Sequence, residues 1–208
     1  PWCEALGPAF RQATGIELSF VRLPSEEALA RLQTDPAKPV FDVWFGGGSN
    51  SHYQAFKNAY TQFYRPKAYK DLQQEAKNAI GPTFIPLYQE VLGIGINRDA
   101  LTKKNAPIPQ CWKDLLDPKW KDKIAFGHPA FSGYIATWVL SLNKLYGWDY
   151  FEKLAKQNPL IGRSANDAIT QLSSGERIVA AGPDATTLKA KSRGNPLGII
   201  YPEDGSVF

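Results

Sequence analysis

Apolar positions along the chain follow two alternating spacings. Trp2, Leu6, Phe10 and Ala13 recur at intervals of three to four, which is typical of one buried face of a helix. Shorter runs rich in β-branched and aromatic residues are typical of strands. We therefore expect helices at 1–15, 25–34, 69–80, 111–118, 132–146, 149–157, 165–175 and 184–192, and strands or extended segments at 16–23, 41–45, 83–97, 123–127, 177–182 and 197–202.

This alternation predicts an α/β protein with mostly parallel sheets flanked by helices. Glycines and prolines divide the pattern into two lobes. We expect the first lobe at 1–93 and the second at 97–194, with residues 94–96 and 195–208 as the connections between them. In such proteins ligands bind in the cleft between the lobes, at the carboxyl ends of strands.

Composition and charge narrow the class of protein. The 208 residues are 43% hydrophobic, which is enough for one large domain or two small lobes. Because no apolar run reaches about 18 residues, we expect no part embedded in a membrane. The net charge of +4 comes with scattered lysines and no nucleic-acid-binding motif, so we expect no nucleic-acid partner. The chain lacks methionine and opens directly into a predicted helix, so we expect that a signal peptide has been removed.

A strand, a glycine turn and a serine-headed helix occur twice in the sequence. The strand at 41–45 runs into three glycines, after which Ser49 is predicted to cap a helix. The strand at 123–127 is followed by Ser132, another predicted cap, with Gly133 and Tyr134 in the first helical turn. Free N–H groups at helix N-termini bind anions. Each segment also fits a plain strand-to-helix turn that binds nothing.

Further polar residues fall at strand ends or helix starts. Ser164 is predicted to cap a third helix beside Arg163, whose guanidinium suits a carboxylate or phosphate, and Asp184 begins a fourth helix. We expect one cleft to be lined by Gly47, Gly48, Ser49, Ser132, Gly133, Tyr134, Arg163, Ser164 and Asp184.

Signals for catalysis or metal binding are weak. His52 and His128 are the only histidines and have no metal-ligand spacing, and no nucleophile–base pattern occurs. We therefore expect no enzyme activity, no metal site and no cofactor. Cys3 and Cys111 each neighbour a tryptophan, and their spacing fits either a disulfide bond or two buried free thiols.

Several motifs together resemble a known family. "WCEALGPAFRQATGIELSF", "FDVWFGG", "LGIGIN", "CWKDLLDPKWKDKIAF", "HPAFSGYIAT" and "YPEDGS" occur in the order found in periplasmic solute-binding proteins of ABC importers. The chain is most similar to the family 1 group of the ferric-iron or phosphonate type, which has the type II periplasmic-binding-protein fold. Members also have a strand before the first helix and continue beyond "YPEDGS". We therefore expect the first lobe to lack its first strand and its C-terminal part.

The resemblance implies a function. It implies a periplasmic receptor that captures a small solute between two hinged lobes and delivers it to a membrane permease. An exported protein also favours a Cys3–Cys111 disulfide. The family usually has an acidic residue after the glycine loop, and a histidine where Pro183 stands here. Because only Tyr201 matches the paired tyrosines of ferric-iron binders, we expect a small anionic or zwitterionic solute, such as a phosphonate or sugar phosphate.

Three alternatives stay open at this point. One is a ferric-iron transport protein. Another is the ligand-sensing domain of a signalling protein or the effector domain of a LysR-type transcription regulator, because both share the general fold. The third is an enzyme on a two-lobe fold, such as a transferase with a covalently held cofactor, although the surroundings of Cys111 offer little to activate a thiol.

Overall fold

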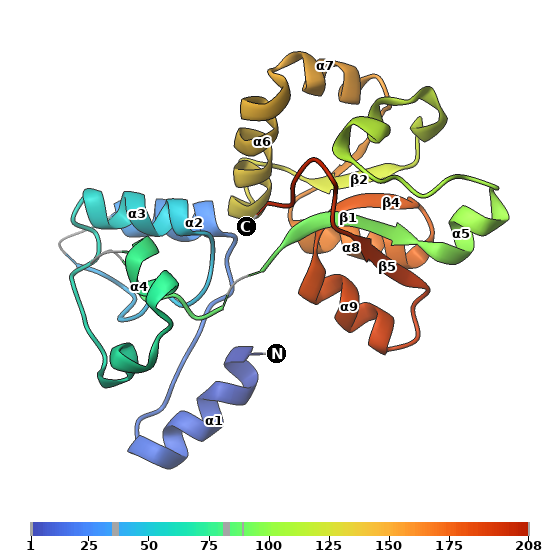
Figure 1. Ribbon diagram of the computed structural model, residues 1–208. Helices are drawn as coiled ribbons and strands as arrows, with labels where there is room; N and C mark the ends of the chain where they lie inside the picture. Colours follow the sequence, from blue (N-terminus) through green and yellow to red (C-terminus); the bar gives the residue numbers. More distant parts are fainter. Residues whose placement is uncertain (1, 35–37, 81–83, 89, 208) are drawn as a thin grey trace.

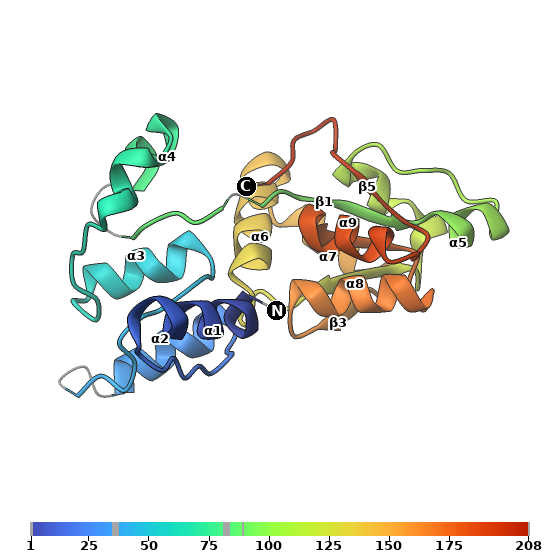
Figure 2. The same cartoon turned by 90° about the horizontal axis from the view of Figure 1, so that it is seen from below.

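The computed structural model describes residues 2–34, 38–80, 84–88 and 90–207. They form two lobes joined by an extended segment that leads into strand β1 (Figures 1 and 2). The described part of the first lobe contains α1 (Trp2–Thr14), α2 (Ser25–Thr34), α3 (Ser49–Lys57), the 3-10 helix η1 (Lys67–Asp71) and α4 (Gln74–Ile80).

The second lobe is built on a five-stranded sheet of order β3-β2-β4-β1-β5. Its strands are β1 (Leu92–Asn97), β2 (Ile124–Gly127), β3 (Leu160–Gly162), β4 (Val179–Pro183) and β5 (Leu197–Ile200). β2 is parallel to β3 and β4, whereas β1 is antiparallel to β4 and β5. The α/β class is confirmed. The sheet is mixed rather than mostly parallel, because β1 enters from the first lobe against the direction of both of its neighbours.

The sheet carries helices on both faces (Figure 1). The helical elements of this lobe are α5 (Arg98–Lys103), η2 (Trp112–Leu116), η3 (Pro118–Trp120), α6 (Gly133–Tyr146), α7 (Asp149–Ala155), α8 (Ala165–Ser174) and α9 (Asp184–Ser192). Because side chains alternate along a strand, Ile94 and Ile96 of β1 point to one face. There they pack in a core with the buried tryptophans Trp112 and Trp138. This core covers one face of the sheet.

The opposite face of the sheet is lined by small residues. Ala125 and Ala180 pack against Ile169 and Leu172 of α8. A side chain added at Gly95 would place its Cβ 3.1 Å from a methyl carbon of Leu172. The small residues therefore let α8 lie close to the sheet, and the closeness fixes the position of its N-terminus.

The segment after β5 is tied to the same lobe. Asp204 accepts hydrogen bonds from the Trp112 backbone N–H, at 2.9 Å, and from the Tyr146 hydroxyl. The Trp112 indole N–H donates to the Gly205 carbonyl at 2.9 Å, and Val207 pairs with Leu92. The "YPEDGS" motif therefore fastens the end of the chain beside α6 (Figures 1 and 2).

Two predicted strands are absent from the described part of the first lobe. Residues 16–23 and 41–45 are extended or bent, and no described segment pairs with either of them. Ile16 is 59% exposed and Val43 is 74% exposed. A strand needs a neighbour for its backbone N–H and C=O groups, so a strand-like sequence does not form a sheet alone. The prediction of strands there was wrong for this structure.

The predicted connections between the lobes lie inside the sheet. Residues 94–96 are the middle of β1, and residues 197–200 within the predicted 195–208 connection form β5. A Cβ at Gly93 would lie 2.7 Å from the Ile200 carbonyl oxygen, and one at Gly198 would lie 2.8 Å from Arg98 Nε. These glycines therefore allow close packing, and the extended backbone between the lobes ends at Leu92.

Two predicted helices are broken in the structure. The helix expected at 111–118 is replaced by η2 and η3, because Pro118 cannot continue a helix that would need its N–H. The one expected at 69–80 is divided into η1 and α4. None of the described helices combines the length and the apolar character needed to cross a membrane.

Candidate functional site

Two helices begin without a side-chain cap where the lobes meet. The N-cap of α3 is Gly48 rather than the predicted Ser49, which is the first helical residue. The N-cap of α6 is Ser132, as predicted, but its side chain makes no capping hydrogen bond. The first N–H groups of a helix have no partner within it, and they carry the positive end of its dipole. Both helices therefore offer donors suited to an anion.

The two helix starts approach each other backbone to backbone. A Cβ built on Gly48 would lie 3.4 Å from the Gly133 Cα, and one built on Gly133 would lie 3.4 Å from the Gly48 Cα. The Gly48 N–H also donates to Ser25 Oγ at 3.4 Å, so α2 begins at the same place. A methyl group would fit at either position as an ordinary van der Waals contact, whereas a larger side chain would press on the backbone of the other lobe.

The glycine turn before α3 is held by aromatic rings. Gly46 and Gly47 have φ angles of 82° and 96°, which only glycine adopts readily. The His52 ring lies 2.8 Å from the Gly46 carbonyl oxygen and 4.1 Å from the Trp44 ring centroid. Burial lowers the pKa of His52, which favours the neutral ring. Because a carbonyl can only accept, Nε2–H is the donor to Gly46.

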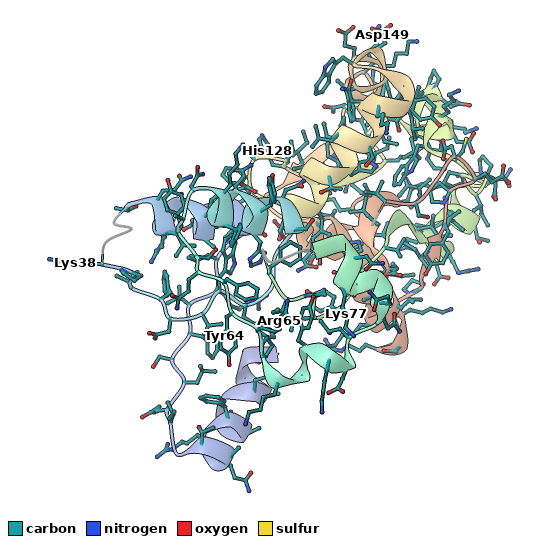
Figure 3. All side chains as sticks on the ribbon, turned by 60° about the vertical axis from the view of Figure 1, so that its left-hand side comes forward. Lys38, Tyr64, Arg65, Lys77, His128 and Asp149 are labelled. Carbon is teal, nitrogen blue, oxygen red and sulfur yellow. The ribbon has the colours of Figure 1, made fainter. Side chains whose placement is uncertain are left out.

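Arg163 reaches across from the second lobe to the first. Its guanidinium lies 3.6 Å from the Glu27 carboxylate and 5.3 Å from the Phe131 ring centroid. Its side chain is 69% exposed, so this ion pair adds little stability. The Phe131 ring is tilted by 44° to the ring of His128, which is labelled in Figure 3, and the ring centroids lie 5.2 Å apart. The positive charge of Arg163 therefore lies beside the junction, paired with Glu27 of the first lobe.

Ser164 is engaged in its own helix. Its hydroxyl accepts from the Asp167 N–H at 3.2 Å, and its N–H donates to the Asp167 carboxylate at 2.9 Å. This reciprocal capping box satisfies the start of α8. The predicted cap is confirmed, and α8 thereby differs from α3 and α6, whose starts have no side-chain cap.

Asp184 joins three separate segments. Its Oδ1 accepts from the Val91 N–H at 3.2 Å and from the Ala185 N–H at 2.6 Å, and its Oδ2 lies 3.3 Å from the Tyr201 hydroxyl. Val91 precedes β1, Ala185 lies in α9 and Tyr201 follows β5. The carboxylate therefore fastens the entry and exit of the sheet at the start of α9.

Glu90 is a site residue that the sequence did not reveal. It is half-buried, and it interacts with Tyr134 in the first turn of α6, which also contacts Tyr88. Burial raises the pKa of Glu90; the nearby charge of Asp184 raises it further, and the Tyr134 hydrogen bond opposes the shift. Burial also raises the pKa of Tyr134, and the Glu90 charge adds to this. A lone glutamate before a strand carries no recognisable motif, which is why its role was missed.

The contacts bring most of the predicted residues to one junction. Gly48 contacts Gly133 across the lobes, and their chain neighbours Gly47, Ser49 and Ser132 flank this contact at the starts of α3 and α6. Arg163 adjoins this junction through Glu27 of α2. Asp184 lies close enough to Glu90 for its charge to raise the pKa of Glu90, which also interacts with Tyr134. Solute binding by these residues stays a prediction.

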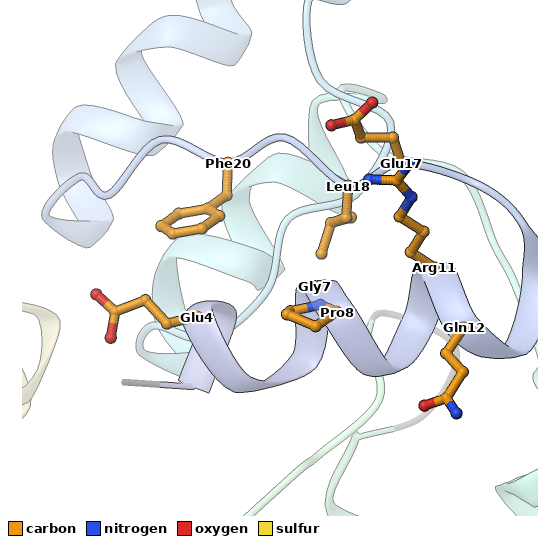
Figure 4. A pocket seen from close by; sticks show the side chains of 8 residues that line it. All are labelled: Glu4, Gly7, Pro8, Arg11, Gln12, Glu17, Leu18 and Phe20. Carbon is orange, nitrogen blue, oxygen red and sulfur yellow. The ribbon is translucent and has the colours of Figure 1, made fainter.

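A separate groove lies on the first lobe. It has a volume of about 590 Å³ and runs between α1 and residues 17–20, with Arg11, Glu17 and Phe20 among its walls (Figure 4). None of the predicted site residues lines it. Its walls are exposed, with Phe20 at 46%, so we place the site at the junction of the lobes and not in this groove.

The predicted disulfide lies partly outside the described side chains. Cys111 is a free thiol in the structure, while the side chain of Cys3 is not among those described. Burial raises the pKa of the Cys111 thiol, although the Asp114 backbone N–H partly offsets this. The disulfide therefore remains a prediction.

The described residues form a helical lobe and an α/β lobe whose helix starts meet at the junction, an arrangement that suits a two-lobe binding protein. A sequence profile of the bacterial extracellular solute-binding proteins matches residues 41–208. Since this is most of the chain, the chain belongs to that family.

Known proteins that resemble the chain agree with this assignment. An uncharacterised protein of Haemophilus influenzae is 27% identical over 99% of this chain and 62% of its own length. The periplasmic binding protein AfuA from Actinobacillus pleuropneumoniae, solved with fructose 6-phosphate, has a TM-score of 0.92 at 27% identity, over 98% of this chain and 66% of AfuA. The chain thus spans slightly less than two thirds of each relative.

A more distant structure shares the fold alone. Iron-bound HitA from Pseudomonas aeruginosa has a TM-score of 0.77 at 20% identity, over 95% of this chain and 65% of HitA. Its likeness supports the two-lobe architecture and leaves the solute open.

Proposed function

We propose that this protein is the receptor of an ABC importer that captures a small phosphate-bearing, hydroxylated solute between its lobes. The observation that carries the proposal is the meeting of α3 and α6 at Gly48 and Gly133, where both helices start without a side-chain cap. Free N–H groups with two converging helix dipoles suit a phosphate.

Side chains around these starts support an anionic group. The Ser132 residue is only 8% exposed, and its side chain makes no hydrogen bond that caps α6. It therefore provides one more donor beside the helix N–H groups. Arg163 stands on the rim as a counter-charge that can bind a phosphate through two nitrogens.

The likeness to AfuA agrees with this choice of solute. AfuA was solved with fructose 6-phosphate, which combines an anionic ester with several hydroxyl groups. AfuA is 27% identical to this chain, so fructose 6-phosphate is a reasonable compound to test. The uncapped starts of α3 and α6 are the physical reason to expect that it binds.

A periplasmic location and a permease partner complete the proposal. Both are inferred from membership of the extracellular solute-binding family. A receptor in an oxidising compartment would carry the Cys3–Cys111 disulfide, which closes a long loop and restricts the unfolded chain.

Ferric iron is a second candidate ligand. Tyr88, Tyr134 and Glu90 gather phenol and carboxyl oxygens near each other. Binding of iron would have to displace a Tyr134 proton whose pKa burial and the Glu90 charge raise in the free protein. The phosphate-bearing solute is favoured by the uncapped starts of α3 and α6.

Two measurements decide between the candidates. Native mass spectrometry of the freshly purified protein should show a bound mass that carries a phosphate group. Calorimetry with fructose 6-phosphate should give a dissociation constant near micromolar, which corresponds to a binding free energy of about −8 kcal/mol. A visible tyrosinate–iron absorption band on adding ferric citrate, with no heat from any phosphate ester, would contradict the proposal.

A further inference from the structure

One ion pair crosses from the first lobe to the second. Glu27 lies in the first turn of α2, and Arg163 lies between β3 and α8. The Arg163 Nη2 atom is 3.6 Å from the Glu27 Oε2 atom. The other ion pair found among the described residues, Lys119–Asp117, lies within the second lobe. The Glu27–Arg163 pair is therefore placed where it can respond to the arrangement of the lobes.

Arg163 is held firmly on the second lobe. It directly precedes Ser164, whose capping box with Asp167 fixes the start of α8. A Cβ built on Gly127 would lie 2.7 Å from the Ser164 carbonyl carbon, so this start is pressed against β2. The Phe131 ring centroid lies 5.3 Å from the guanidinium carbon of Arg163. These contacts restrict the side chain before it pairs, which lowers the entropy that pairing costs.

Glu27 is held in a similar way on the first lobe. Its neighbour Glu26 accepts a hydrogen bond of 2.6 Å from the Ser51 hydroxyl, which ties α2 to α3. The Ser25 Oγ atom lies 3.7 Å from a Cβ built on Gly133, so α2 begins at the junction itself. Because each partner is fixed to its own lobe, any rotation of one lobe against the other must change the distance between Glu27 and Arg163.

The remaining contacts across the junction carry no charge. Gly48 and Gly133 meet through neutral backbone. The Asn50 side-chain amide donates to Thr137 Oγ1 at 3.5 Å, which is long for a hydrogen bond. Among the described residues, the Glu27–Arg163 pair is thus the contact between the lobes that responds to ionic strength.

We propose that Glu27 and Arg163 form an electrostatic latch that favours the closed arrangement, in which Gly48 contacts Gly133, even when no solute is bound. The pair is exposed, so its loss should change the ratio of closed to open molecules by about 1.5- to 5-fold. At 1 M salt the screening length falls to about 3 Å, which should cancel the effect. A guanidinium has five N–H donors, so the latch leaves some of them for an anion.

The test measures the distance between the lobes without solute. Spin labels are placed on non-natural residues at Lys57 of α3 and Lys189 of α9, both exposed, and distances are measured by double electron–electron resonance. The wild type is compared with Glu27→Arg, Arg163→Glu and the double variant that exchanges the two charges. Glu152→Arg, at an exposed position on α7, is the matched control. Melting temperatures show whether each variant is folded.

The latch predicts a specific pattern at 50 mM NaCl. Each single reversal should raise the open fraction relative to the closed one by at least about 2-fold, because repulsion replaces attraction. The double variant should return to the wild-type distribution, and Glu152→Arg should not depart from it. At 1 M NaCl all five proteins should give the same distribution.

Two results would overturn the latch. One is a distance distribution that is identical in the wild type and both single reversals at 50 mM NaCl. The other is a shift that persists in the double variant, because the shift would then not come from the attraction between the two charges. Neither result involves a solute, so a failure of the latch can be told apart from a failure of the proposed function.

Discussion

Gly48 and Gly133 bring two helices from different lobes into backbone contact. A methyl group built on either glycine would lie 3.4 Å from the Cα of the other. That distance is ordinary van der Waals contact, so the interface has room for a methyl group and for little more. The pair therefore sets how closely the lobes approach at the start of α3 and α6.

Replacing Gly133 with valine should hold the lobes apart. The branched side chain would press against Gly48 and against Ser25 Oγ, which lies 3.7 Å from a Cβ at this position. We expect fructose 6-phosphate binding to weaken by about 10-fold or more, because each lost hydrogen bond to a charged group costs about 1.5–3 kcal/mol. Gly133→Ala is the matched control and should stay within a few-fold of the wild type. Calorimetry that finds equal affinities for the valine variant and the wild type would disprove this role.

Gly127 should matter for stability rather than binding. A Cβ there would lie 2.7 Å from the Ser164 carbonyl carbon and 2.8 Å from the Ala165 nitrogen, so the start of α8 must move. We expect Gly127→Ala to lower the free energy of unfolding by about 1–3 kcal/mol, as for other overpacked sites. Gly7→Ala is the control, since no atom lies within 4 Å of its Cβ. Equal free energies of unfolding for the two variants, measured in urea, would contradict the packing argument.

The pH dependence of stability should contain a contribution from His52. Its pKa in the folded protein is lowered from 6.5 because burial disfavours the charged ring. The unfolded chain therefore binds the proton more readily, and stability is lost as pH falls from about 6.5 through the folded-state pKa. His52→Gln should lack this part of the decline. The prediction is wrong if the melting temperatures of the two proteins fall by the same amount between pH 7.5 and 5.0.

Glu90 should cost stability in the absence of solute. Its folded-state pKa is raised, chiefly by burial, so the folded protein holds this proton more tightly than the unfolded chain. Glu90 therefore stabilises the fold at a pH below its pKa in the unfolded chain, and this contribution is lost as the pH rises through its pKa in the folded protein. Glu90→Gln should therefore melt at a higher temperature than the wild type at pH 7, and the two should converge near pH 3. A lower melting temperature for the variant at pH 7 would be the contrary result.

The second lobe could be predicted well from the sequence because its signals are local. Buried runs such as residues 92–97, and the cap at Ser164, determine their own structure. The sequence also indicated Gly48 and Ser132, since a glycine turn before a helix is a local pattern.

The sequence could not show which residues interact across the lobes. Val43 and Phe45 look like strand residues, but a strand also requires a partner that no local pattern reveals. Gly93 was expected to end the first lobe, whereas in the structure it lies inside the sheet in close contact with Ile200. Glu90 became a candidate only when folding placed it against Tyr134.

The location of the bound phosphate is the most direct test of the account. Backbone amide signals of the isotopically labelled protein can be followed by NMR during a titration with fructose 6-phosphate. The account predicts large, saturable shifts at the first N–H groups of α3 and α6, which are those of Ser49, Asn50, Gly133 and Tyr134. Saturable shifts confined to the groove beside α1, or no shifts at all, would contradict it.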